Sequence, residues 1–193
     1  MLRRYRLALG LWLCCVTMVF VAFTSAYIVR RGVPTYDTET GVYSTHWETL
    51  QAPGLSLLTN SLLLVGAALA MEAARRRSCT SCGQENLARP SSIWTFASLI
   101  LVLGFLAGQA MVWNVLRRSG EAMESGARLA FFYLLTAAHA LNVALGLGAL
   151  LWLAVRGARW STAKRRLATD LMAWYLDAMA ILWIGLLCIV WFD

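Results

Sequence analysis

The sequence has 193 residues, of which 60% are hydrophobic and only 14% carry a charged side chain. This composition is far more apolar than that of an ordinary soluble domain, so a membrane is the expected solvent. The net charge of +7 does not indicate nucleic-acid binding, because the basic residues form short clusters between long uncharged runs rather than one stripe. Such clusters are typical of loops at a bilayer surface.

Five apolar runs are long enough to cross a bilayer, whose hydrocarbon core takes about 20 residues of α-helix. They cover residues 7–29, 55–71, 93–116, 129–155 and 171–192. Membrane-spanning strands are excluded, because continuous apolar runs lack the alternation of a membrane barrel. The first run is longer than the apolar part of a secretory signal peptide, so we expect a retained span. The sequence therefore predicts an all-α fold, with residues 1–193 forming a single membrane domain that is a bundle of five transmembrane helices.

The basic residues also predict the orientation of the bundle. With the N-terminus inside, twelve Lys and Arg residues lie in the inner segments and five in the outer ones. Because inner loops are enriched in basic residues, we expect the N-terminus inside and the C-terminus outside.

Whether the chain could bind a redox cofactor can be judged by counting the residues that could act as its ligands. A membrane haem held by two histidines needs both of them within the spans, but only His139 lies in one, since His46 is in the first outer loop. Cys79 and Cys82 form a CxxC motif in an inner loop, and without a second pair nearby we expect reduced thiols rather than a zinc or redox site. We therefore expect no catalytic residue, no cofactor and no metal ion on this chain.

Polar residues inside the spans are the candidate functional residues, because each must meet another polar group, a lipid headgroup or water. Thr136, His139, Asn142 and Gly146 recur at helical spacing and form one stripe, which we expect to face protein. This stripe fits hydrogen bonding between helices, or a specific lipid or proton role. The candidates for lipid or interhelical polar contacts are Asn60, Glu72, Gln109, Thr136, His139, Asn142 and Asp177.

Asp177 is the most unusual of these residues, because it lies about two turns into the fifth span. A carboxylate at that depth must pair, be protonated or meet water. His139 and Gln109 are its candidate partners. Glycines mark expected close contacts between helices, at Gly104 and Gly108 in the third span and at Gly146 with Gly148 in the fourth.

The segment 131–143 reads FFYLLTAAHALNV, which resembles the FFYxLTGxHGLHV motif of cytochrome c oxidase subunit III in its short bacterial form with five helices. Three further stretches agree with that family in order along the chain. They are residues 53–64 with Asn60, the run Gly108-Gln109-Ala110 followed by Trp113, and Tyr175 with the apolar tail that begins at Leu182.

The resemblance implies a non-redox third subunit of a haem-copper terminal oxidase, in the inner membrane of a bacterium with aerobic respiration. It implies direct packing on subunit I, association with subunit II, and phospholipid bound between the helices. The role would be to support assembly, proton uptake and stability during turnover. Haem and copper would then belong to the partner subunits, and this chain would have no catalytic centre of its own.

Some polar positions depart from the family pattern. Val16 and Val112 replace residues that are usually acidic, Asn142 replaces a His, and Asp177 and Ala180 fall on the family's His and Asp. These departures leave open a second function, an accessory subunit of a nitric oxide reductase system, which shares the five-helix fold.

A third function is a small carrier or channel, for which Asp177 and His139 would couple transport. The unbroken spans and the lack of internal repeats disfavour it.

Overall fold

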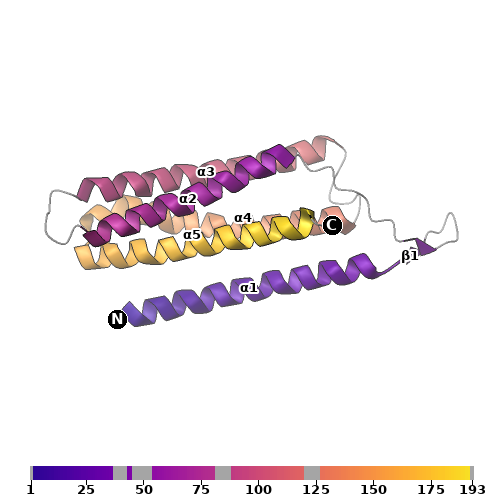
Figure 1. Ribbon diagram of the computed structural model, residues 1–193, viewed down its shortest axis with the longest axis horizontal. Helices are drawn as coiled ribbons and strands as arrows, with labels where there is room; N and C mark the ends of the chain where they lie inside the picture. The colour runs from indigo at the N-terminus through magenta and orange to yellow at the C-terminus, as the bar shows by residue number, and fades with distance from the viewer. Residues whose placement is uncertain (1, 37–42, 45–53, 81–87, 120–126, 192–193) are drawn as a thin grey trace.

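The computed structural model describes residues 2–36, 43–44, 54–80, 88–119 and 127–191. Five long helices run along one common axis (Figure 1). They are α1 Leu2–Gly32, α2 Gly54–Thr80, α3 Ala88–Arg118, α4 Ala127–Arg156 and α5 Thr162–Trp191. All five are long and apolar enough to cross a membrane. The predicted all-helical class and the number of spans are confirmed.

Short elements lie between some of these helices. Strand β1 (Thr35–Tyr36) pairs antiparallel with β2 (Tyr43–Ser44) between α1 and α2, and the 3-10 helix η2 (Gly157–Arg159) joins α4 to α5. The sequence did not predict the strand pair, because strands of two residues are too short to show an alternating pattern.

The helices extend beyond the predicted apolar runs, and α2 shows why. It continues past residue 71 to Thr80, although the hydropathy signal ends at the first charges. Glu72 accepts hydrogen bonds from Arg75 at 2.5 Å and Arg76 at 2.8 Å, one turn further along the same helix. Pairs at this spacing stabilise a helix, so its final turns can carry charges at the membrane surface.

Four of the helices form the core of the bundle, and α1 lies at its side. Helix α2 packs closely on α3, and α5 contacts both α2 and α4, whereas α1 packs mainly on α4 and α5 (Figure 1). Only 11% of the most apolar stretch of α1 is buried, compared with 44% in α5. The fully buried side chains include Leu64, Phe105, Leu150 and Trp183, one from each core helix.

Two glycines allow close packing between neighbouring helices. A Cβ atom at Gly108 would overlap the side-chain amide of Asn60 in α2, and one at Gly146 would overlap the ring of Tyr175 in α5. A Cβ atom at Gly148 would meet nothing within 4 Å. The expected contact at Gly148 is therefore wrong, because this residue faces away from the neighbouring helices.

We predict that Gly146→Ala destabilises the bundle by about 1–3 kcal/mol, as expected for overpacking a well-packed contact. The ring of Tyr175 cannot easily move aside, because its hydroxyl donates a hydrogen bond to the backbone carbonyl of Asn142 at 2.7 Å. Gly148→Ala, two residues further along the same helix, is the matched control for the change in helix propensity and should leave stability unchanged or slightly raised. Denaturation in mixed micelles, followed by tryptophan fluorescence, measures both. Equal stability of the two variants would contradict the packing described for Gly146.

Candidate functional site

His139 lies at the centre of the bundle, on α4, among aromatic rings from three other helices. Its ring centroid is 5.1 Å from that of Trp183, 5.9 Å from Phe105 and 6.1 Å from Phe20. The side chain is fully buried, and neither ring nitrogen has a hydrogen-bond partner among the described residues. A buried water molecule is the usual partner of such a group. The imidazole therefore fills the space where α1, α3, α4 and α5 meet.

Hydrogen bonds between side chains join the core helices. Asn60 of α2 donates to Gln109 of α3 at 3.3 Å, and both side chains are buried. The indole of Trp113 in α3 donates to Thr136 of α4 at 3.1 Å. Such bonds between membrane helices contribute roughly 1 kcal/mol each. Three of the predicted polar residues therefore hold neighbouring helices together.

Two further hydrogen bonds between helices were not predicted from the sequence. Trp183 of α5 donates to Ser61 of α2 at 3.0 Å, and Ser98 of α3 donates to the backbone carbonyl of Ala67 at 2.9 Å. Serine is common, and its hydroxyl can bond the backbone of its own helix, as that of Ser61 does with Leu57, so its position along the chain gives no signal of a partner on another helix.

The predicted stripe on α4 faces the interior of the bundle. Thr136, His139 and Gly146 are buried, and Asn142 is partly buried. The side chain of Asn142 donates to the backbone carbonyl of Ala138 at 2.9 Å. The stripe is thus satisfied largely by bonds within the protein, with His139 as the exception among the described residues.

A cluster of charges ties three helices together at the end of the bundle that holds the N-terminus. Asp170 of α5 accepts hydrogen bonds from Arg6 of α1 at 2.7 Å and from Arg75 of α2 at 3.3 Å. Arg75 also binds Glu72 of its own helix. We call Arg6, Glu72, Arg75 and Asp170 the arginine clamp. The sequence predicts that these charges lie at span ends on one side of the membrane. It does not predict which of them form pairs.

Asp177 is not brought together with its expected partners. It is exposed on the outer face of α5, whereas His139 and Gln109 are buried inside the bundle. Trp183, whose ring packs on His139, lies six positions after Asp177 in α5. At about 100° per residue, Asp177 lies roughly 120° around the helix from that ring. The expected pairing therefore fails for geometric reasons.

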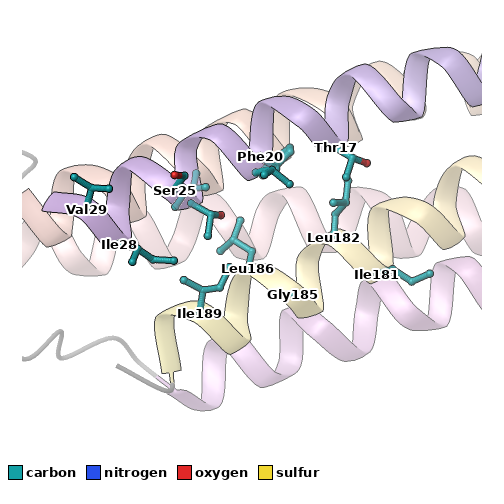
Figure 2. A pocket seen from close by; sticks show the side chains of 13 residues that line it. Thr17, Phe20, Ser25, Ile28, Val29, Ile181, Leu182, Gly185, Leu186 and Ile189 are labelled. Atoms are coloured by element: carbon teal, nitrogen blue, oxygen red, sulfur yellow. The ribbon is translucent and has the colours of Figure 1, made fainter. Parts of the chain in front are cut away.

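A cleft of about 510 Å³ separates α1 from α5. Figure 2 shows Phe20 of α1 and Leu182 and Leu186 of α5 pointing into the space between the two helices. The lining is apolar apart from the hydroxyl groups of Thr17, Thr24 and Ser25. The hydroxyl group of Thr17 donates a hydrogen bond to the backbone carbonyl of Leu13 at 2.8 Å. The cleft is suited to an alkyl chain.

The two candidates for metal or redox chemistry fall in parts of the chain that the structure does not describe. They are His46 and the CxxC motif, of which Cys82 and the side chain of Cys79 lie outside the described residues. Within the described ranges, no group of three or more His, Cys, Asp or Glu could hold a metal ion.

These features define a multi-pass helical membrane protein with a polar layer between its core helices. No family model matches the sequence. The chain is similar to the probable cytochrome c oxidase subunit 3 of Mycobacterium bovis and of Mycobacterium tuberculosis, at 32% identity over 100 residues, and to that of Nocardia farcinica at 31%. The match covers 51% of this chain and 49% of each relative, so the chain spans about half the length of the curated relatives it matches. These distant homologues support the resemblance to oxidase subunit III.

We predict that Asp170→Asn loosens the N-terminal half of α1. The substitution weakens the pairs with Arg6 and Arg75, and the first of these joins α1 to α5. Because the Arg6 side chain is 55% exposed, each pair contributes at most about 1 kcal/mol, so amide exchange in this half should rise by up to about fivefold. Hydrogen exchange in detergent micelles measures the effect. Arg159→Gln removes an exposed charge near the same end and is the control; equal exchange in both variants would contradict the clamp.

Proposed function

We propose that this chain is the cofactor-free third subunit of a haem-copper terminal oxidase of the cytochrome c oxidase type. The observation that carries the proposal is the similarity over 100 residues to proteins named probable cytochrome c oxidase subunit 3. Two features of the chain support it: five apolar helices, and the interior position of Thr136 and His139. Both residues belong to segment 131–143, which resembles a family motif.

In this role the chain packs on subunit I and associates with subunit II in a bacterial inner membrane, with its N-terminus inside. The partner subunits hold haem and copper, and this chain carries no electrons. It supports assembly, proton uptake and stability during turnover. The large apolar residues exposed on all five helices support such a role, because in a membrane these faces meet lipid or the helices of partner subunits.

The proposal includes one structural phospholipid, with an acyl chain in the cleft between α1 and α5. The apolar lining and the volume of about 510 Å³ support this occupant. Arg30 and Arg31 follow the cleft residues Ile28 and Val29 at the C-terminal end of α1. A basic pair at this level would attract the phosphate of the headgroup.

We predict that the complete complex, purified in mild detergent through a tag on this chain, contains haem-bearing oxidase subunits and a haem Soret band. The chain expressed alone should show no Soret band, because His139 is the only histidine in its spans. Absorbance spectra and mass spectrometry measure both. Recovery of nitric oxide reductase chains instead, or stoichiometric haem on the isolated chain, would overturn the proposal.

We predict that Gly185→Leu lowers the amount of bound phospholipid at least severalfold. Gly185 lines the cleft, and a Cβ atom there would meet nothing within 4 Å, so the larger side chain fills the cleft without straining the bundle. Gly148→Leu adds the same side chain at another open glycine that does not line the cleft, and should retain the lipid. Native mass spectrometry counts the bound lipids. Equal lipid occupancy in the two variants would show that the cleft is not the lipid site.

A further inference from the structure

Asp177 is a carboxylate near the middle of a membrane-spanning helix, and it points away from its own bundle. The span of α5 covers Thr162–Ile189, and Asp177 lies on its exposed face. Its neighbours on this face are large and apolar: Trp174 is 55% exposed, Ile181 69% and Ile184 47%. A charged or protonatable group in such a position is rare in membrane helices, and it usually marks a function or a partner.

The described part of the chain offers Asp177 no hydrogen bond or ion pair. The charges that act on it are those of Glu72 and Arg75. These two charges have opposite sign and already pair with each other. Asp177 therefore remains without a partner of its own in this part of the chain.

The arginine clamp shows which helices flank this face. Asp170 lies seven residues before Asp177, about two turns away on the same side of α5, and it is reached by Arg6 from α1 and by Arg75 from α2. The outer face of α5 therefore lies between α1 and α2.

Deeper in the membrane, the flanking helices cannot repeat this pairing. Helix α1 runs in the same direction as α5, whereas α2 runs in the opposite direction (Figure 1). Seven residues beyond the clamp, α1 has Leu13 and α2 has Ala68, neither of which has a side-chain donor.

Lipid headgroups are also too distant to provide the partner. Asp177 lies about 10 Å deeper than Asp170, at 1.5 Å per residue. A side chain as short as aspartate cannot extend over that depth, unlike a lysine or arginine. An ionised carboxylate at this depth therefore needs a partner from within the membrane.

We propose that the outer face of α5, between α1 and α2, binds a transmembrane helix of another polypeptide that offers a Lys or Arg side chain to Asp177. A carboxylate only accepts hydrogen bonds, and its strongest partners are basic groups. Trp174 and Ile184 provide apolar contact surface on either side of the charge. The inference does not rest on the proposed function, because it follows from the position of the carboxylate alone.

The test places a photo-crosslinking amino acid at Ile184, seven residues from Asp177 and outside the α1–α5 cleft, in the full chain in its native membrane. We expect a crosslink to a transmembrane peptide of another chain that contains Lys or Arg. In the same background, Asp177→Asn should lower the yield about tenfold or more, because it leaves the partner's charge unpaired. Asp177→Glu keeps the charge and should retain most of the yield.

The control carries the crosslinker at Ile100 of α3, which is 67% exposed, and its yield should not respond to Asp177→Asn. A yield at Ile184 that is unchanged by Asp177→Asn overturns the inference. Crosslinks only to lipid, to a second copy of this chain, or to a segment without Lys or Arg also overturn it. The haem content of the complex is measured separately, so failure of this inference is distinguishable from failure of the proposed function.

Discussion

The structure depends on one constraint: the hydrocarbon region of a membrane offers no bulk water, so a polar side chain there needs a partner inside the protein. The contacts between α2, α3, α4 and α5 are built around this requirement. Asn60 meets Gln109, Trp113 meets Thr136, and Trp183 meets Ser61, each across a helix boundary. Glycine allows the approach where it is closest, since any side chain at Gly108 would overlap Asn60. Packing and hydrogen bonding therefore fix the same helix positions.

Helix α1 is attached to the bundle in a different way from the four core helices. It is joined to α5 by an ion pair between Arg6 and Asp170 at one end, while further along the two helices are separated by the apolar cleft. An exposed ion pair is weak, so α1 is the helix that can move most easily relative to the core. A lipid chain in the cleft would complete the contact between α1 and α5, which would make the lipid part of the tertiary structure.

The departures from the family pattern have a consistent structural result. Val16 and Val112 stand where the resembled family usually has acidic residues, and both are buried in the apolar core. His139 is surrounded by aromatic rings and has no hydrogen-bond partner among the described residues. The carboxylate near the middle of α5, that of Asp177, is on the outside instead. In the described part of the chain, the fully buried core thus contains no Asp or Glu side chain. Asp177 lies instead on a face that another chain can reach.

The sequence alone determined the number of helices, their approximate limits and the polar stripe on α4, because hydropathy and helical spacing are properties of a single helix. Tertiary structure decided which side chains from different helices meet, including Asn60 with Gln109 and Asp170 with two arginines. It also decided that Asp177 faces outward, contrary to the expected pairing with His139. Hydropathy shows that a helix crosses the membrane but not how it is rotated about its axis, and that rotation is set only by packing against neighbouring helices.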